Sequence, residues 1–298
     1  MNAPVLSLAL LLTPAANAGA PADVELASRK PQLLAPRGAP PAPSAPRRIV
    51  SLAPVVTETL FLLGQGERVV GVTRFCDTPS AAQALPKVGG YVDVSLEQIL
   101  TLSPDLVMAM PSLGQREILE RMRDAGVPVL VLFGDTLAEV RELVGAVGAA
   151  TGASARATAV TTEIDNALGR FAAARPGAHS GRVLAVVGVR PIVVAGPGSF
   201  IGELFAQGAV TNAVAAGAPQ WPTWSLERLS RRHVDTIVVA AGQETKVELE
   251  RMLADAFPAA ERPRLVVAAG PILMRPGPAI GRDLDALAAL LRPASGAP

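Results

Sequence analysis

Apolar positions in the first half of the chain alternate between two patterns. Short runs rich in Val, Ile and Leu predict strands, and stretches with apolar residues three and four positions apart predict helices. The predicted strands cover residues 48–53, 68–75, 105–110 and 128–133. The helices between them cover residues 56–66, 95–102 and 115–126. This alternation predicts an α/β lobe over residues 48–134, with a mostly parallel sheet flanked by helices.

The second half of the chain repeats this plan. Strands are predicted at residues 182–189, 191–196, 235–242 and 264–270. Helices are predicted at residues 199–208, 225–232, 246–257 and 281–291. We therefore expect a second α/β lobe over residues 177–298.

Residues 135–176 lie between the lobes, and from residue 136 to residue 175 they contain no proline and no strand-like run. Apolar residues there recur at helical spacing, which predicts one long, rigid connecting helix of about 50 Å at about 1.5 Å per residue. Gly145, Gly148 and Gly152 weaken its middle, so a break near Gly152 is an alternative. A helical strut predicts that the lobes do not open widely.

The two lobes share a short sequence repeat. Ser95, Leu96, Glu97 and Asp105 recur 130 positions later as Ser225, Leu226, Glu227 and Asp235. Each serine is suited to cap a helix, and each glutamate lies in a first turn, where the helix dipole favours an anion. Gln98 completes a capping box in the first copy, and Arg228 takes its place in the second.

Rare aromatic residues precede both copies of the repeat. Tyr91, the only tyrosine, stands four positions before Ser95, and Trp221, one of two tryptophans, stands four before Ser225. Equivalent loops of two facing lobes would place these flat side chains on opposite walls of one cleft, around a flat or apolar ligand. The second tryptophan, Trp224, is expected to pack beneath Trp221.

Composition narrows the class of protein. The formal net charge of +1 gives no reason to expect binding to nucleic acid or to an acidic membrane surface. Cys76 is the only cysteine, so an intrachain disulfide is impossible. With only two histidines, no histidine-rich metal site exists.

The first 47 residues are interpreted as an export signal followed by a tether. Residues 5–12 form a short apolar run and "ANA" at 16–18 fits a cleavage site, so residues 1–18 are interpreted as a signal peptide and the mature chain as periplasmic. The apolar run is far shorter than the roughly 20 residues that span a bilayer. Residues 19–47 are dense in proline and are expected to form an extended tether without regular structure.

One enzyme alternative comes from the glycines at the start of a predicted helix. Gly196, Gly198 and Gly202 lie between a strand and a helix, close to a dinucleotide fingerprint. The last interval is one residue too long, and Pro197 stiffens the turn. No pair of base and nucleophile can be assembled from the sequence. We expect no catalytic activity and no resident cofactor.

Several segments together resemble a known family. "RIVSLAPVVTETLFLLGQGERVVGVTRFCDTP", "LPKVGGYVDVSLEQILTLSPDLVMAM", "QWPTWSLERL" and "MRPGPAIGRDLDALAALL" resemble the substrate-binding proteins of ABC importers in the helical-backbone class. That class carries cobalamin, haem and ferric siderophores. The resemblance covers about residues 48–291 and is greatest to receptors for cobalamin. It implies two α/β lobes and capture of a corrinoid in the cleft between them.

The resemblance also implies which residues bind the ligand. Phe75, Tyr91, Trp221 and Arg275 are expected to line the site, with Arg74 as a further candidate. Asp77 and Pro222 are expected to fix the shape of their loops.

Two other ligands stay open. Haem receptors of the class use a tyrosine phenolate as axial ligand in about the loop of Tyr91, and a phenolate suits Fe(III). A ferric siderophore is less favoured, because clefts for anionic chelates usually offer several basic residues, and here only Arg74 and Arg275 are candidates.

The resemblance gives the repeated glutamates a role. In such importers, glutamates at the positions of Glu97 and Glu227 pair with arginines of the two membrane permease subunits. A receptor with two pseudo-equivalent lobes can meet a two-fold axis with one contact per lobe. We expect a monomeric receptor that docks in this way. Two ordinary helix starts remain the alternative interpretation.

Overall fold

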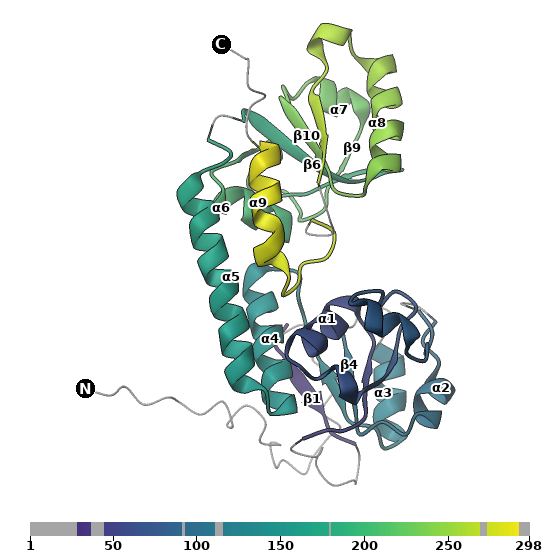
Figure 1. The fold of residues 1–298 in the computed structure, drawn as a ribbon. Helices are drawn as coiled ribbons and strands as arrows, with labels where there is room; N and C mark the ends of the chain where they lie inside the picture. Colours follow the sequence, from purple (N-terminus) through teal and green to yellow (C-terminus); the bar gives the residue numbers. More distant parts are fainter. Residues whose placement is uncertain are drawn as a thin grey trace, which may run out of the picture. The chain divides into compact units, whose positions relative to one another are not determined.

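The computed structural model describes residues 29–36, 45–90, 93–110, 116–178, 180–268 and 273–291. The chain forms two compact units (Figure 1). The first contains residues up to Gly134 together with Ala138–Thr161. The second contains Asp135–Leu137 and the chain from Thr162 onward. Each unit is an α/β fold with one sheet, as the sequence predicts.

The first unit is built on a five-stranded sheet in the order β1-β5-β4-β2-β3. Its strands are β1 (Gln32–Leu34), β2 (Ile49–Ser51), β3 (Val69–Val72), β4 (Leu106–Ala109) and β5 (Val129–Val131). The pairs β5/β4, β4/β2 and β2/β3 are parallel, and β1/β5 is antiparallel. The helices are α1 (Pro54–Leu62), α2 (Leu96–Thr101) and α3 (Arg116–Asp124). These elements lie where the apolar pattern predicts them, apart from β1.

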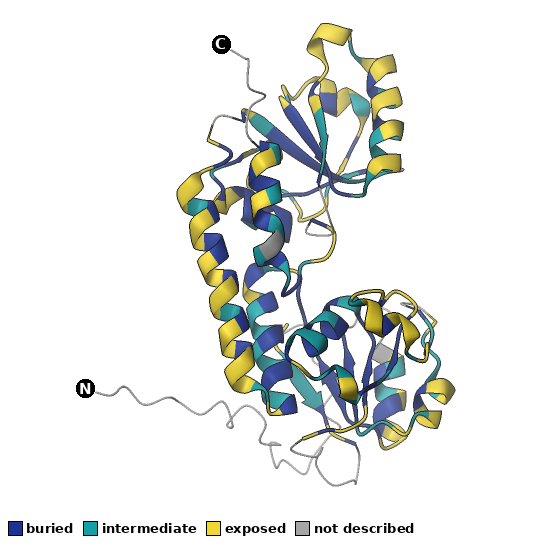
Figure 2. Ribbon diagram, viewed as in Figure 1, coloured by how far each residue is buried: buried dark blue, intermediate teal, exposed yellow. Residues whose placement is uncertain are grey.

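Alternation along the strands divides the core of the first unit between the two faces of its sheet. Val50, Val107 and Val129 belong to one buried cluster, which also contains Ile99 of α2 and Met122 of α3. The alternate strand residues are also buried, and α1 packs against β2 and β3. Figure 2 shows most strands in dark blue, with β1 largely in teal, and the helices exposed along one side. Strands that are buried on both faces favour the continuous apolar runs seen in the sequence.

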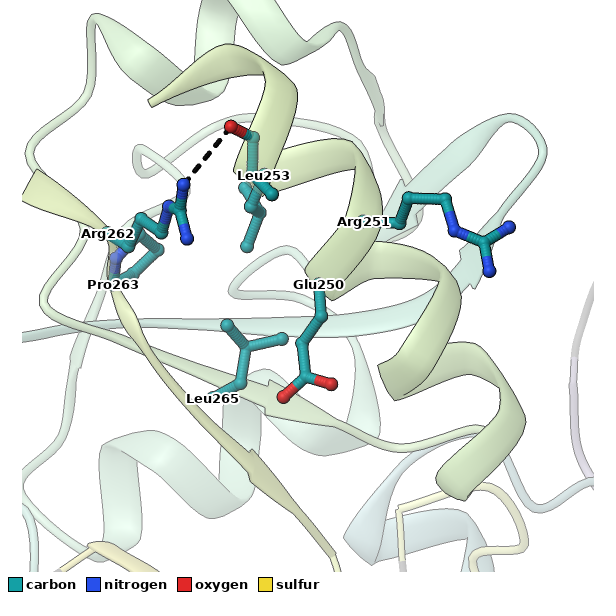
Figure 3. A pocket seen from close by; sticks show the side chains of 7 residues that line it. Glu250, Arg251, Leu253, Arg262, Pro263 and Leu265 are labelled. Carbon is teal, nitrogen blue, oxygen red and sulfur yellow. Dashed lines mark hydrogen bonds between the residues drawn. The ribbon is translucent and has the colours of Figure 1, made fainter. Parts of the chain in front are cut away.

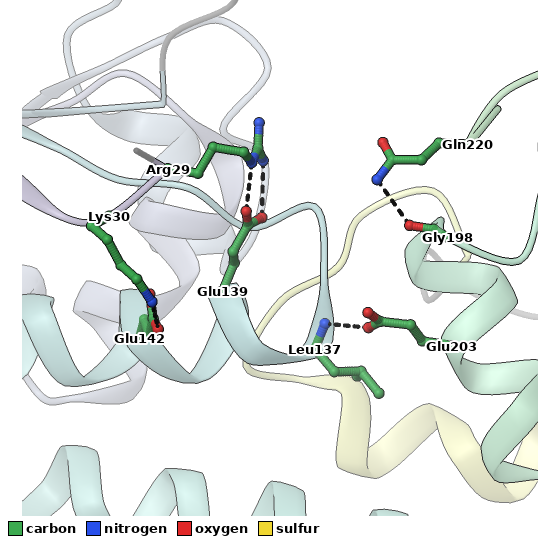
Figure 4. A network of polar contacts seen from close by, with 8 residues as sticks. All are labelled: Arg29, Lys30, Leu137, Glu139, Glu142, Gly198, Glu203 and Gln220. Atoms are coloured by element: carbon green, nitrogen blue, oxygen red, sulfur yellow. Dashed lines mark hydrogen bonds and ion pairs between the residues drawn. The ribbon is translucent and has the colours of Figure 1, made fainter. Parts of the chain in front are cut away.

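Strand β1 corrects the expectation that residues 19–47 form a tether without regular structure. Its backbone pairs with the open edge of β5, and Leu34 is buried in the cluster of Val129. Arg29 donates to Glu139 over 2.6 Å, and Lys30 pairs with Glu142 (Figure 4). The apolar run of Leu33 and Leu34 between prolines is long enough to complete the edge of a sheet, which would otherwise expose unpaired backbone groups.

The connecting segment is two helices rather than one helix over residues 135–176. Helix α4 spans Leu137–Thr151 and α5 spans Ser154–Ala174. The chain turns at Gly152, whose φ of +74° lies in the left-handed region that favours glycine. A Cβ on Gly148 would lie 2.4 Å from Cβ of Ala157, so that glycine lets the two helices approach closely. With 21 residues, α5 is about 32 Å long at about 1.5 Å per residue.

The halves of α5 belong to different units. Its residues up to Thr161 cluster with the first unit and those from Thr162 with the second. The start of α4 is also fixed in the second unit, because the backbone N–H of Leu137 donates to Oε2 of Glu203 over 2.7 Å (Figure 4).

The second unit has a mixed sheet in the order β11-β10-β6-β7-β9, with β8 also pairing β6. Its strands are β6 (Arg182–Val189), β7 (Ile192–Val194), β8 (Thr211–Asn212), β9 (Thr223–Trp224), β10 (Thr236–Val239) and β11 (Arg264–Val267). The pairs of β7 with β6 and β9 are antiparallel, and the other three pairs are parallel. Parallel pairs therefore predominate here too, but the hairpin β6–β7 departs from the plan of the first unit.

The helices of the second unit are α6 (Phe200–Gln207), α7 (Leu226–Ser230), α8 (Gln243–Ala256) and α9 (Ile280–Leu291). Leu229 of α7 and Leu249 of α8 pack with Val186, Val194 and Ile237 of the strands. In the part of the chain that the structure describes, no helix combines the length and the apolar composition needed to cross a membrane.

The sequence repeat has the same backbone role in both units. The hydroxyl of Ser95 accepts from the N–H of Gln98 over 3.2 Å, and that of Ser225 accepts from Arg228 over 3.1 Å. The second bond of the predicted capping box would run from the N–H of Ser95 to the Gln98 side chain. In the structure the N–H of Ser95 donates to the carbonyl of Val88 instead.

The repeated aspartates attach the first parallel strand of each unit. Asp105 accepts from the N–H groups of Arg47 and Arg48 over 2.7 and 3.0 Å. Asp235 accepts from the N–H of Arg182 over 2.7 Å. Each aspartate also donates its own N–H to the carbonyl of the same arginine, Arg48 or Arg182. The repeat is thus a fold device that joins the helix, the strand that follows it and the neighbouring strand.

Candidate functional site

Two of the predicted ligand residues lie just after the carboxyl end of β3. Arg74 and Phe75 follow Thr73, the first residue after the strand, and about half of the Phe75 side chain (49%) is exposed. The Arg74 guanidinium lies over the Phe75 ring at 5.1 Å from its centroid, a cation–π distance. Buried Cys76 holds the turn, with its N–H donating to the carbonyl of Thr73. The turn therefore holds the Phe75 ring at the surface and not in the core.

Asp77 is part of the turn that follows Phe75. Its carboxylate accepts from the Thr78 hydroxyl over 3.3 Å, and its carbonyl accepts from Nε2 of Gln83 over 2.9 Å. These bonds are of the kind that fix a loop, in line with the role predicted for Asp77.

Arg74 also forms a paired contact that sequence analysis missed. Its two terminal nitrogens donate to the two carboxylate oxygens of Asp93, each over 2.8 Å. The hydrogen bond from Arg74 lowers the pKa of Asp93, and the same bond raises the pKa of Arg74. Asp93 also accepts from the N–H of Gly90 over 3.1 Å. Asp93 therefore joins Arg74 to the backbone of Gly90, besides any contact that Arg74 makes with a ligand.

Tyr91 lies outside the residues that the structure describes. Its described neighbours are well anchored, because the N–H of Arg74 donates to Gly89 and that of Ser95 to Val88. The ligand role of Tyr91 stays a prediction.

Trp221 precedes β9 in the second unit and is 44% exposed. Backbone bonds hold the loop on both sides of it. The carbonyl of Gln220 accepts from the N–H of Gly196 over 2.8 Å, and that of Pro222 accepts from Val194 over 3.0 Å. The Gln220 side chain donates to the carbonyl of Gly198 over 2.9 Å (Figure 4). The carbonyl of Pro222 thus helps to hold this loop, and the role of Pro222 in shaping the ligand site stays a prediction.

Gly196 and Gly202, next to this loop, have structural roles, which argues against their being a dinucleotide fingerprint. A Cβ on Gly196 would lie 2.2 Å from the carbonyl oxygen of Pro219, so only glycine lets the Trp221 loop approach. The N–H groups that would face a pyrophosphate already have acceptors: Gln220 for Gly196, and the Ser199 hydroxyl for Gly202. The turn between β7 and α6 supports the Trp221 loop.

The two tryptophans have opposite environments. Trp224 is 4% exposed and belongs to the core cluster of the second unit. The Arg228 guanidinium lies over its ring at 5.0 Å from the centroid. Only Trp221 is available to solvent and to a ligand.

Arg275 lies in the segment between β11 and α9 and is exposed. Its neighbour Met274 is 47% exposed, although Leu273 beside it is buried. Five large apolar side chains are notably exposed among the described residues: Phe75, Leu100, Trp221, Val247 and Met274. Three of them lie in the predicted ligand loops. Sequence reasoning missed Met274, and its only signal was the position next to Arg275.

Glu97 and Glu227, the predicted docking residues, lie in the first turns of α2 and α7 and are exposed. Within the described residues, the Glu97 side chain has no hydrogen bond or ion pair. Glu227 forms an ion pair with Arg231 over 2.7 Å.

A pocket elsewhere in the second unit contains none of the predicted site residues. It lies between α8 and the chain at Arg262, Pro263 and Leu265 (Figure 3). Arg262 donates to the carbonyls of Phe257 and Ala254, so it caps the carboxyl end of α8. Arg262 therefore has a structural role at the end of α8.

Known proteins resemble both the sequence and the fold. A vitamin B12-binding protein of Pectobacterium carotovorum is 25% identical over 201 residues, which are 67% of this chain and 73% of that protein. The periplasmic vitamin B12 binding protein of Vibrio cholerae superposes with a TM-score of 0.70 at 22% identity, over 84% of this chain and 98% of that one. A periplasmic heme-binding protein from Roseiflexus superposes with a TM-score of 0.69 at 28% identity, over 82% and 97%.

The family itself follows from a match that covers most of the chain. The family described as "Periplasmic binding protein" matches residues 49–262, which begin at β2 and extend past α8. This range includes the loops of Phe75 and Trp221 and both copies of the repeat. Two α/β units with exposed aromatic loops and this family match lead to one conclusion: the chain belongs to the periplasmic binding protein family.

Proposed function

We propose that the chain captures cobalamin in the periplasm and delivers it to an ABC importer. The observation that carries this proposal is the pair of exposed aromatic side chains, Phe75 and Trp221, each on a loop fixed by several hydrogen bonds. A large, exposed apolar side chain on a fixed loop is suited to pack against a flat macrocycle without ordering the loop on binding. Vitamin B12-binding relatives at about a quarter identity support the choice of ligand.

The proposed site contains residues from each unit. Phe75 and Tyr91 of the first unit, and Trp221 and Arg275 of the second, contact the ligand. Met274 adds a further apolar contact next to Arg275. Asp77 and Pro222 fix loops, and Arg74 acts chiefly through Asp93. That the two sets line one cleft stays a prediction.

Titration with cyanocobalamin tests the proposal, with haemin and ferric siderophores as competitors. Binding should quench tryptophan fluorescence. Trp221→Ala should lower the affinity about 5- to 150-fold, since stacking on one aromatic ring contributes about 1–3 kcal/mol. Phe75→Ala should weaken binding in the same direction. Trp224→Phe is the matched control, because its ring is buried in the core and should leave affinity unchanged. Equal affinity of wild type and Trp221→Ala would contradict the proposal.

Haem is the second candidate, favoured by the similarity to a heme-binding protein at 28% identity and by Tyr91. If haem is the ligand, Tyr91→Phe abolishes the absorption band of a tyrosinate–Fe(III) complex. If cobalamin is the ligand, the same variant keeps most of the affinity, because a phenyl ring still stacks.

Export and delivery complete the proposal. Residues 1–18 are removed as a signal peptide, which amino-terminal sequencing of the mature protein tests. The mature chain is a monomer in solution, which light scattering tests. Glu97 and Glu227 dock on the permease, so Glu97→Ala with Glu227→Ala should lower uptake and leave ligand affinity unchanged. Normal uptake by this double variant would contradict docking by the two glutamates.

A further inference from the structure

A salt bridge between Arg74 and Asp93 lies beside Phe75, in the part of the first unit where we place the ligand. The two terminal nitrogens of Arg74 donate to the two carboxylate oxygens of Asp93, each over 2.8 Å. The guanidinium also lies over the exposed ring of Phe75. The side chains of the pair are 49% and 57% exposed. The aromatic ring, the cation and the anion therefore form one surface that a ligand can reach.

Gly90 is fitted to this salt bridge. Its N–H donates to Oδ1 of Asp93 over 3.1 Å. A Cβ on Gly90 would lie 2.6 Å from the same oxygen and would collide with the Arg74 guanidinium. A larger residue at position 90 would therefore displace the pair. The salt bridge is part of how the loop is built, unlike an ion pair between two long side chains on an open surface.

The charges in the two predicted ligand loops of the first unit sum to zero. Residues 73–79 and 86–93 contain two basic and two acidic side chains: Arg74, Lys87, Asp77 and Asp93. Lys87 donates to a backbone carbonyl close to it in the sequence. Arg74 is the cation next to the aromatic ring, and Asp93 cancels its charge. An anionic ligand therefore meets no net positive charge at these loops.

We propose that Asp93 is a specificity-determining residue. By cancelling the charge of Arg74, it makes the first unit favour an uncharged, amide-bearing edge of the ligand over a carboxylate-bearing edge. The paired guanidinium has further N–H donors, and the carboxylate has further lone pairs. A primary amide donates and accepts, so it matches both partners, whereas a carboxylate only accepts and is repelled by Asp93. The corrin ring of cobalamin carries primary amides at its edge, and haem carries propionates. This inference rests on the proposed function and adds what selects the ligand.

Calorimetric titration of three variants tests this role. The probes are cyanocobalamin and its monocarboxylic acid derivatives, in which one peripheral amide is a carboxylate. The amide preference is the Kd of the acid divided by the Kd of cyanocobalamin. Asp93→Asn leaves the charge of Arg74 uncompensated and should lower this preference about 2- to 5-fold, whereas Arg74→Gln should raise it by a similar factor. The double variant is neutral again and should return to within about two-fold of wild type. Added salt should reduce these differences.

The opposite signs of the two single variants separate charge from structure. Loss of the contact alone would shift the preference in the same direction in both, and Asn at position 93 keeps an acceptor for the N–H of Gly90. Haemin, as a second anionic probe, should bind more tightly to Asp93→Asn than to wild type. An unchanged preference, or shifts of the same sign, in a wild type that binds cyanocobalamin would overturn this inference alone. A wild type that does not bind cyanocobalamin would overturn the proposed function, and this inference with it.

Discussion

The two copies of the repeat, at Ser95–Ala109 and Ser225–Val239, differ where they meet solvent and agree where they build the fold. Both serines cap their helices, and both aspartates hold the neighbouring strand. Between these shared residues, Leu100 faces solvent on α2, and Ser230 and Arg231 face it on α7. The shared serines and aspartates therefore meet the same folding requirement in both units, whereas the exposed positions between them differ in chemistry.

The loops in front of the two helices are also held by different means. An ion pair between Arg74 and Asp93 pins the first loop, whereas backbone hydrogen bonds to Gly196 and Val194 pin the Trp221 loop. We therefore expect the Arg74–Asp93 contact, and not the backbone bonds of the Trp221 loop, to weaken in acid.

The largest expected effect concerns the aspartates. Asp105→Ala removes two charge-assisted hydrogen bonds and should lower the free energy of unfolding by about 2–3 kcal/mol, whereas Asp235→Ala removes one and should cost about half as much. Urea unfolding followed by circular dichroism measures both losses. Tryptophan fluorescence would not serve, because both tryptophans lie in the second unit and Asp105 lies in the first. A larger loss for Asp235→Ala than for Asp105→Ala would contradict an equal contribution from each of the three bonds.

The serine caps should be equal. Ser95→Ala and Ser225→Ala should each lower the free energy of unfolding by about 1 kcal/mol, since each leaves one N–H of a first helical turn without its acceptor. Thr at either position is the control, because it keeps a hydroxyl. A clear difference between the alanine variants would show that the caps are not equivalent.

The loops should respond differently to acid. Because the folded pKa of Asp93 is lowered, the ion pair stabilises the loop above the unfolded value of about 3.9, and this stabilisation is lost as the pH falls through the folded pKa. The amide resonance of Gly90, which donates to Asp93, should shift over this range. The amide of Gly196 should not shift, because its acceptor is a backbone carbonyl. In Arg74→Ala the Gly90 transition should move to higher pH.

The smallest effect is expected for the ion pair on α7. Arg231→Ala should change the free energy of unfolding by at most about 0.5 kcal/mol, because both side chains of the Glu227–Arg231 pair are largely exposed. Thermal melting measures this. A drop of 2 kcal/mol would mean that the pair is structural.

Much of the fold was predictable because its signals are local. Strands were marked by apolar runs, and α2 and α7 by a serine whose hydroxyl meets an N–H three residues later. The likeness of the two lobes was visible in the repeat. Phe75 and Trp221 were found because aromatic residues are rare in this chain, and the structure places both in exposed loops.

The sequence by itself determined the two α/β units, most of their helices and strands, and the exposed positions of Phe75 and Trp221. Only the tertiary structure decided the role of residues whose partners are distant along the chain. Asp93 meets Arg74 across 19 positions, β1 pairs with β5 across about 100, and Gly196 meets the loop at Gln220. The break at Gly152 likewise depends on the packing of α4 against α5. Local hydrogen-bonding and apolar periodicity are written into neighbouring residues, but contacts between distant segments exist only once the sheets bring those segments together.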